Sequence, residues 1–276
     1  MKIQFLGTAA AEGIPAMFCK CPVCLNALAV RGKEVKTRSQ AIVDDKILID
    51  FPADTYMHML QHNIDLTVIR TLVITHSHCD HFYERDFWCR LPGIANEIGE
   101  EPLHVYMTAA ALRQAEEFAN AHMKGNTRVV FHEIRPFEPF EAEGYRFIPL
   151  RANHDRNADP VFYIIEKDGK SALYANDTGI FPDETVEYLA SYGRPFDFVS
   201  LDCTGMLLTG WRNGHMDLGT NAEMYAKLSE MGLCTENTVA YVNHFSHNGH
   251  LTHEQLVEEA DKLGFGASYD GLSVSF

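Results

Sequence analysis

The chain has few basic residues for its length. Lysine and arginine number 23 against 38 aspartates and glutamates, which gives a formal net charge of −15 at pH 7 and an isoelectric point near 5.3. Binding along a phosphate backbone needs a basic surface that displaces counterions. We therefore expect neither extended nucleic acid nor an anionic membrane as a partner. A small substrate with one or two phosphates stays compatible, because bound divalent cations would reverse the local sign of the charge.

Long apolar runs are also lacking. No segment approaches the roughly 18 consecutive apolar residues that a membrane span needs. The opening residues do not show the basic and apolar regions of an export signal. We therefore expect a soluble, cytoplasmic protein. The seven cysteines are an odd number, which in such a protein favours free thiols or metal ligands over a disulfide framework.

Low-complexity linkers, charge blocks and visible internal repeats are absent as well. A chain of 276 residues with 46% hydrophobic content can bury a sizeable core, and α/β sandwiches of this length are commonly single units. We expect one domain over residues 1–276. The sequence leaves the oligomeric state open, a homodimer included.

Strand-like and helix-like segments alternate along the chain. The pattern of β-branched and aromatic residues predicts strands at 2–7, 41–50, 68–75, 103–107, 145–150, 161–175 with a hairpin turn at Asp168-Gly169, 196–203 and 239–244. Helical patterns cover 52–61, 109–123, 183–192, 220–231 and 253–263. Capping boxes at Thr220 with Glu223 and at Thr252 with Gln255 mark two helix starts. This order predicts an α/β fold in which early and late strands form the halves of a sandwich, with helices outside.

The most informative segment is His76-Ser77-His78-Cys79-Asp80-His81, which follows the apolar run 68–75. Alternate side chains of an extended segment point the same way. His76 and His78 can therefore hold one cation while Asp80 and His81 turn toward a second. Three separately hydrogen-bonded core histidines would be the alternative, and histidine is too scarce for that to be a favoured explanation.

Further candidate ligands also follow predicted strands. They come after Leu150, after Ala175 and within 242–244. A rim shared by two sheets would bring all these loops together.

The histidine-rich segment, with isolated His154, Asp177 and His244 downstream in that order, resembles the metallo-β-lactamase fold superfamily. Within it, the opening segment 5–15 (FLGTAAAEGIP) and the following Cys19-Lys20-Cys21-Pro22-Val23-Cys24 are similar to the phosphodiesterases that accompany carbon-phosphorus lyase and act on cyclic ribose phosphates. The resemblance implies an αββα sandwich, with two mixed β-sheets flanked by helices.

The same resemblance implies a set of metal ligands. The first metal would bind His76, His78 and His154, the second would bind Asp80, His81 and His244, and Asp177 would bridge them. One carboxylate can hold two divalent cations about 3.5 to 4 Å apart, with a hydroxide between them. Such ligands accept several metals, so we expect manganese or zinc, with iron as a third option. Taken singly, His154 could be merely hydrogen-bonded, and Asp177 could be an Asx-turn residue.

A second cluster lies near the N-terminus. Cys19, Cys21 and Cys24 form a thiolate knuckle that needs a fourth ligand to close a tetrahedral zinc site. His247, three residues after His244, is the candidate, as in the lyase-associated family. Three unligated, reduced cysteines are the alternative interpretation. We expect the remaining cysteines to be ordinary buried thiols: Cys79, Cys89, Cys203 and Cys234.

His215 matches the position at which the resembled family supplies a histidine near the leaving group. As a general acid it would protonate the departing oxygen, although an exposed loop histidine is the plainer interpretation. We assign His215 and Asp80 as the catalytic residues. Asp50, at the end of a predicted strand, would hold a ligand imidazole from behind or cap the following helix.

These residues predict a dinuclear metal-dependent hydrolase, most simply a phosphodiesterase for a small cyclic or other small phosphodiester. A metal-bridging hydroxide would attack phosphorus. The alternatives are hydrolysis of a lactone, thioester or other carboxyl derivative in the same site, and a non-catalytic metal-binding subunit. The complete ligand set disfavours the last, the lack of an export signal disfavours a β-lactamase, and the acidic balance disfavours a tRNA nuclease.

Overall fold

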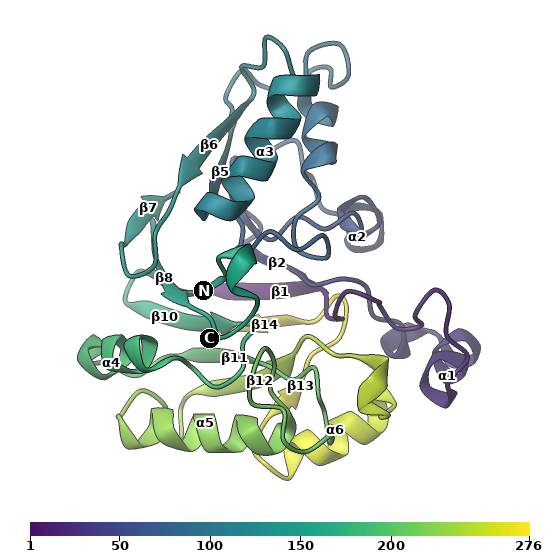
Figure 1. Ribbon diagram of the computed structural model, residues 1–276, viewed down its shortest axis with the longest axis vertical. Coiled ribbons are helices and arrows are strands. Elements are labelled where there is room, and N and C mark those ends of the chain that lie inside the picture. Colours follow the sequence, from purple (N-terminus) through teal and green to yellow (C-terminus); the bar gives the residue numbers. More distant parts are fainter.

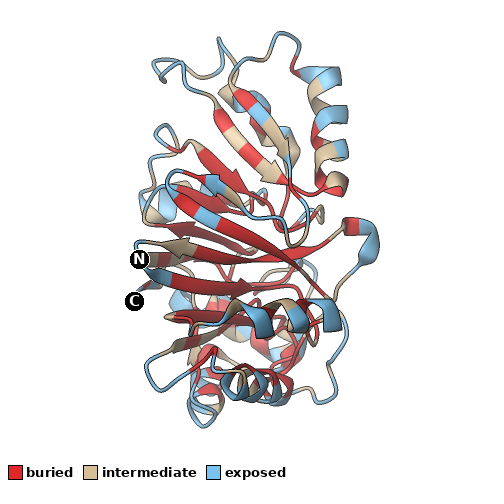
Figure 2. Cartoon of the chain, turned by 90° about the vertical axis from the view of Figure 1, so that its left-hand side faces the viewer, coloured by how far each residue is buried: buried red, intermediate tan, exposed pale blue.

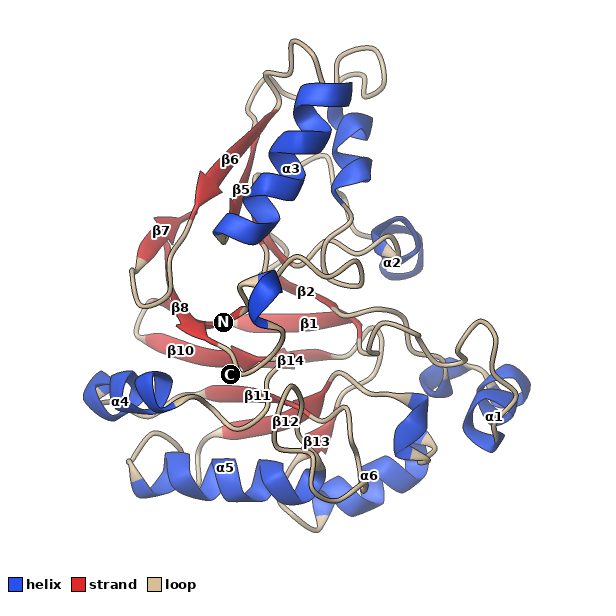
Figure 3. Cartoon of the chain, viewed as in Figure 1, coloured by secondary structure: helices blue, strands red, loops and turns tan.

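The computed structural model describes residues 1–276 and contains two mixed seven-stranded sheets that face each other, with helices on the outer sides (Figure 1, Figure 3). The first sheet has the order β14 (Ser273–Ser275), β1 (Lys2–Gly7), β2 (Gln40–Val43), β3 (Ile47–Ile49), β4 (Thr71–Val73), β5 (Leu103–Met107) and β6 (Val129–Glu133). The second has the order β13 (Gly266–Ala267), β12 (Val239–Asn243), β11 (Phe198–Asp202), β10 (Lys170–Ala175), β9 (Val161–Lys167), β8 (Tyr145–Arg151) and β7 (Phe140–Ala142).

Six α-helices complete the fold: α1 (Pro22–Val30), α2 (Thr55–His62), α3 (Ala109–His122), α4 (Asp183–Tyr192), α5 (Leu218–Glu230) and α6 (His253–Asp261). In Figure 1, α3 lies along β5 and β6, whereas α5 and α6 lie along the second sheet and α1 projects to one side. The αββα arrangement expected from the sequence is confirmed. No helix combines the length and the apolar character that crossing a membrane would require.

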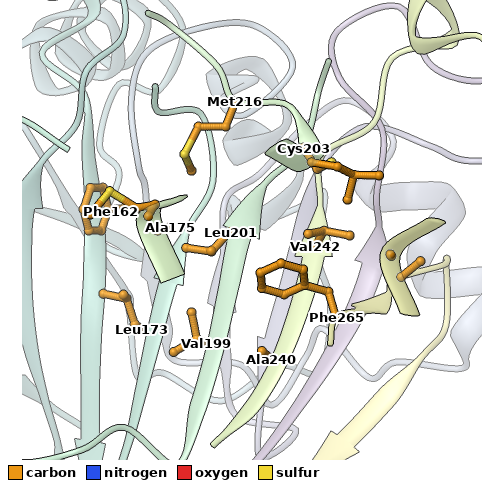
Figure 4. Close-up of a cluster of buried hydrophobic side chains, with 14 of the residues drawn as sticks. Phe162, Leu173, Ala175, Val199, Leu201, Cys203, Met216, Ala240, Val242 and Phe265 are labelled. Carbon is orange, nitrogen blue, oxygen red and sulfur yellow. The ribbon is translucent and has the colours of Figure 1, made fainter. Parts of the chain in front are cut away.

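Alternation along the strands builds the layers. In β10, Ala172 and Tyr174 point into a cluster of 18 buried residues between the sheets, while Leu173 and Ala175 point into a cluster of 31 that includes residues of α4, α5 and α6. Successive strand side chains point to opposite faces, so one strand serves both layers. Figure 4 shows Leu173, Val199, Leu201 and other members of the larger cluster.

A third cluster of 15 buried residues fills the space between the first sheet and α3. Figure 2 shows the consequence: the strands are largely buried, whereas the outer faces of the helices are exposed. Burial on both faces fixes the register of the central strands, because a slip of one residue would exchange their two faces.

Most of the predicted elements are confirmed, with shifts at their ends. The helix predicted at 183–192 and the strands at 2–7 and 103–107 have the expected bounds. The segment 41–50 is a hairpin instead of one strand, because Asp44 and Asp45 take left-handed conformations (φ 47° and 58°). The strand expected at 68–75 is limited to Thr71–Val73.

One of the two predicted capping boxes is correct. Thr252 and Gln255 form theirs at the start of α6. The box at Thr220 is wrong, because α5 begins at Leu218 and the side chain of Asp217 accepts from the backbone N–H of Thr220. The strands β6, β7, β13 and β14 and helix α1 are not among the predicted elements.

The carboxyl ends of several strands meet at one rim. β3, β4 and β5 are mutually parallel, as are β10, β11 and β12, so each group directs its following loops to one edge. The chain turns sharply there: Asp50, Asp177 and His244 each follow a strand in a left-handed conformation (φ 66°, 48° and 64°). Non-glycine residues adopt this region rarely and often at functional sites.

Candidate metal centre

Three of the expected ligands converge on Asp177 from different loops. His76 and His78 come from the loop after β4, and His154 comes from the loop after β8. His78 Nδ1 lies 3.0 Å from His76 Nε2 and 3.2 Å from His154 Nε2. His76 Nε2 is 3.2 Å from Asp177 Oδ2. All four residues offer ligand atoms within 4.8 Å of one another.

A second group meets the same carboxylate. His81 Nε2 lies 2.8 Å from Asp177 Oδ2, 3.2 Å from His244 Nε2 and 3.4 Å from Asp80 Oδ2. These four residues are all buried and also offer ligand atoms within 4.8 Å of one another. The structure thus brings together all seven residues that the sequence suggested for a dinuclear site.

Asp177 is the residue that the two groups share. It is 2% exposed, and its oxygens face His76, His81 and His244. Its side chain makes no hydrogen bond to a nearby backbone N–H, so the Asx-turn alternative is not what the structure shows. Geometrically, one carboxylate lies between two ligand groups.

The far nitrogens of the imidazoles have acceptors of their own. His81 Nδ1 donates to Asp50 Oδ2 at 2.6 Å, and His154 Nδ1 donates to the carbonyl of Gly214 at 2.9 Å. His76 Nδ1 lies 3.0 Å from Thr75 Oγ1, which itself donates to Asp50. These contacts fix the tautomer in which the nitrogen that faces the cluster carries no proton and keeps its lone pair. This is usual for histidines that bind metals.

His78 follows the same pattern with a longer contact. Its Nε2 lies 3.4 Å from Asp155 Oδ2, and its Nδ1 is the nitrogen that faces the other rings. Asp155 is not among the residues suggested by the sequence. The interpretation of Asp50 as a support for a ligand imidazole is confirmed by its contact with His81, and the helix-capping alternative is wrong because Asp54 occupies the position before α2.

The charges of the cluster fit a cation. Burial lowers the pKa of His76 to about 3, so this ring is neutral, as a metal ligand must be. Burial opposes protonation of His244, but the carboxylate of Asp177 raises the pKa of His244 to about 10. Asp177 Oδ1 is also buried without a hydrogen bond of good geometry. The buried carboxylate of Asp177 thus attracts positive charge, and imidazole nitrogens face it. Divalent cations bound here would supply that charge.

His215 lies at the edge of this cluster and is oriented by Asp202. Its Nδ1 is 3.0 Å from Asp202 Oδ2 and 3.5 Å from Asp177 Oδ1. Burial lowers the pKa of His215, but the Asp202 carboxylate outweighs it and raises that pKa above its ordinary value. His215 is therefore held in place by a hydrogen bond to Asp202. It is not the exposed loop histidine of the plainer interpretation.

Asp202 is a residue that the sequence reasoning did not identify. It ends β11 fully buried, and its Oδ1 accepts from the backbone N–H groups of Thr204 at 3.1 Å and Met216 at 2.9 Å. The sequence did contain a signal for it. Asp202 stands at the end of a strand, where its carboxylate lies at the rim, as Asp50 does after β3. The position of His215 beside it depends on the long loop between β11 and α5.

The cluster opens into a cavity of about 340 Å³. Its lining comprises Ala10, Ala11, Glu12, His78, Asp80, His154, Asp177, Thr204, Trp211, His215, His244, Ser246 and Asn248. A cavity of this size suits a small substrate. Glu12, Trp211 and Asn248 are lining residues that the sequence did not suggest.

The cysteine knuckle has the expected fourth partner. His247 Nδ1 lies 3.5 Å from Cys21 Sγ and 3.6 Å from Cys19 Sγ, and Cys24 completes a group with ligand atoms within 4.8 Å. Burial raises the pKa of Cys21, but hydrogen bonds from the Cys24 backbone and His247 outweigh it and lower that pKa to about 6, which favours the thiolate that zinc binds. Three thiols and one imidazole this close together are a set of donors that zinc binds.

The other four cysteines divide into two pairs. Cys203 and Cys234 are buried as expected. The expectation is wrong for Cys79 and Cys89, which are exposed. Cys79 lies in the turn of the histidine-rich segment, where its neighbours His78 and Asp80 point inward and leave it on the outside.

Comparisons with known proteins agree with this architecture. A model of the β-lactamase superfamily domain matches residues 46–269. No protein among those of curated function matches the chain. Among solved structures, a diphosphatase from the PhnP family is similar over 100% of this chain and 97% of its own, with 24% identity and a TM-score of 0.76.

Two further structures share the fold at lower identity. Zinc-bound PqqB from Methylobacterium extorquens has 18% identity and a TM-score of 0.75, with full coverage of both chains (100% and 100%). The short form of human tRNase Z has 15% identity and a TM-score of 0.69, and covers 100% of this chain and 99% of its own. With its matching family model and its His/Asp cluster, the chain belongs to the β-lactamase superfamily as a metal-dependent hydrolase of the metallo-β-lactamase fold.

Proposed function

We propose that this hydrolase is a dinuclear phosphodiesterase that acts on a small phosphodiester, cyclic or open. The observation that carries the proposal is the pair of four-residue ligand groups that share Asp177, with the supported imidazole of His215 beside them. Two cations that share a carboxylate can stabilise both the attacking and the leaving oxygen of a displacement at phosphorus. A proton donor at one side of the pair is what expulsion of an alkoxide needs.

Seven side chains would hold the two active-site cations: His76, His78, His154, Asp80, His81, His244 and Asp177. Imidazole and carboxylate donors suit manganese or zinc, with iron as a third option, and the knuckle suits one structural zinc. When bound, the two active-site cations supply a water of lowered pKa and positive charge for the phosphoryl oxygens.

Asp80 and His215 are the groups proposed to move protons. Asp80 lines the cavity beside His81 and His244, where its carboxylate can orient the attacking water and accept its proton. Nδ1 of His215 is held by Asp202, so Nε2 is the nitrogen available to donate. As the phosphorus–oxygen bond to the leaving group breaks, this proton passes to the departing oxygen and an alcohol is released.

The net charge of the protein and the size of the cavity support a small substrate. The formal charge of −15 opposes binding of an extended polyanion, and the cavity of about 340 Å³ has room for a small molecule. The diphosphatase of the PhnP family, as a structural neighbour, supports chemistry at phosphorus. We propose a small phosphorylated compound as the partner of this site.

Metal analysis combined with a substrate panel tests the proposal. We expect three metals per chain and turnover of bis-p-nitrophenyl phosphate or cyclic nucleotides. The variant Asp177→Asn should lose metal from the dinuclear site, and His215→Ala should retain metal but lose turnover of cyclic nucleotides, whose leaving group is an alkoxide, by roughly a hundredfold. His122→Ala, an exposed histidine at the end of α3, is the matched control. Turnover of lactones or thioesters alone would refute the phosphodiesterase assignment.

A further inference from the structure

The substrate cavity contains a single large apolar side chain. Its thirteen lining residues include three hydrophobic ones, of which Ala10 and Ala11 are small and Trp211 is large. The ring centroid of Trp211 lies 6.0 Å from that of His215, with an angle of 36° between the planes. The indole is thus next to the group proposed to protonate the leaving oxygen.

Packing of the protein interior does not account for this ring. Trp211 belongs to none of the three buried hydrophobic clusters, and it is only partly buried. A large aromatic side chain that lines a polar cavity without joining a core leaves apolar surface in contact with water. Such surface is available to a ligand.

The backbone holds Trp211 in a defined position. Its N–H donates to Asp217 Oδ2 at 2.9 Å, while Asp217 Oδ1 accepts from Thr220 at the start of α5. The ring lies against Gly205, where a Cβ would come within 3.0 Å of Trp211 Cγ. A side chain at position 205 would press against the ring, so Gly205 lets the indole lie close to the backbone here. This contact and the backbone bond to Asp217 orient the indole before any ligand binds.

The neighbouring arginine does not line the cavity. Arg212 Nη1 pairs with Glu223 Oε2 on α5 at 2.7 Å, and the Arg212 carbonyl accepts from the N–H of Ile180 at 2.9 Å. These contacts join Arg212 to α5 and to the loop after β10. This part of the loop therefore presents the apolar face of Trp211 to the cavity, and the positive charge of Arg212 stays outside it.

We propose that Trp211 is a stacking platform that selects substrates whose leaving group carries a flat ring, as a nucleoside does. The inference rests on the proposed phosphodiesterase activity, because His215 defines the side of the leaving group. A ring joined by a short linker to the departing oxygen would reach the indole next to His215. Stacking on an aromatic side chain tolerates different rings, since each presents a π-face.

Two substrates that differ only in the ring test this assignment. One is 3′,5′-cyclic AMP, and the other is the cyclic phosphate of methyl riboside, which lacks the base. For Trp211→Ala we expect kcat/KM on cyclic AMP to fall roughly tenfold to a hundredfold, with a change of less than about threefold on the abasic compound. Trp211→Phe should keep most of the activity, because the ring is retained. Trp88→Ala, which changes the other tryptophan, is the matched control.

Fluorescence gives a second measurement that does not depend on turnover. In Trp88→Phe the tryptophan emission comes from Trp211 alone, once the tyrosines are left unexcited. Adenosine 5′-monophosphate should quench it in a saturable way, whereas ribose 5-phosphate should not. Equal loss on both cyclic phosphates, or equal quenching by both monophosphates, would overturn the platform and leave the phosphodiesterase proposal standing. If the unmodified protein hydrolyses neither cyclic phosphate nor bis-p-nitrophenyl phosphate, the proposed function fails, and the quenching still decides whether Trp211 binds flat rings.

Discussion

Replacing Asp202 by asparagine removes one negative charge and changes little else in shape. The carboxylate is fully buried and accepts from the backbone N–H groups of Thr204 and Met216 through Oδ1, and from His215 Nδ1 through Oδ2. The amide oxygen of asparagine would keep the two backbone bonds. Its NH₂ group would then face His215 Nδ1, where Asp202 Oδ2 now accepts a hydrogen bond from that nitrogen.

The expected loss follows from that contact. His215 as an imidazolium is stabilised by an anion at 3.0 Å, and hydrogen bonds to charged groups contribute about 1.5 to 3 kcal/mol. Loss of this bond corresponds to roughly tenfold to a hundredfold in rate. The NH₂ group of asparagine would also meet the N–H that an imidazolium carries on Nδ1, donor against donor, which further disfavours the charged ring that donates the proton.

The assay compares leaving groups. An alkoxide needs a proton as it departs, whereas p-nitrophenolate leaves without one, so kcat for Asp202→Asn should fall roughly tenfold to a hundredfold on an alkyl phosphodiester and by less than about threefold on bis-p-nitrophenyl phosphate. His215→Ala should show the same division, and the double variant should lose little more, because the two residues act as a unit. An equal loss on both substrates, with unchanged metal content, would show that Asp202 only maintains the local structure and would refute the reasoning.

Two further predictions concern the zinc knuckle and the stability of the fold. Cys24→Ser should lower the zinc content by one per chain and lower the Tm, while Cys89→Ser, at an exposed cysteine outside the knuckle, should change neither; unchanged zinc content in Cys24→Ser would count against the site. Burial lowers the pKa of His58 from 6.5 to about 4, so the unfolded chain takes up this proton first as the pH falls. The contribution of the neutral His58 ring to the free energy of unfolding is fully present above pH 6.5. It decreases progressively toward pH 4, by about 3 kcal/mol in all. In urea titrations His58→Gln should lose less stability over this interval than the unmodified protein; parallel curves would contradict the assignment.

Local sequence was sufficient for the ligand loop and for several regular elements. The spacing of His76, His78, Asp80 and His81 lies within one loop, so no knowledge of the fold was needed to see that they could share cations. Helix α4 and strands β1 and β5 were likewise predicted with their bounds, because their periodic burial pattern and bounding residues lie within one short segment.

Elements whose stability comes from neighbours were not predictable in this way. β13 has two residues and β7 and β14 have three each, too few for a pattern. They exist because they pair with β12, β8 and β1 at the edges of the sheets. Pairing partners are chosen by the topology, which a short window of sequence does not contain.

The sequence by itself determined which side chains can bind metal, since imidazole, carboxylate and thiolate chemistry belongs to the residues and their spacing. Only the tertiary structure decided that Asp202 supports His215, that Trp211 lies against Gly205 and lines the cavity, and that Cys79 turns outward. The reason is physical: a ligand's chemistry is local, whereas its orientation is set by hydrogen bonds and packing with residues that the fold brings from distant parts of the chain.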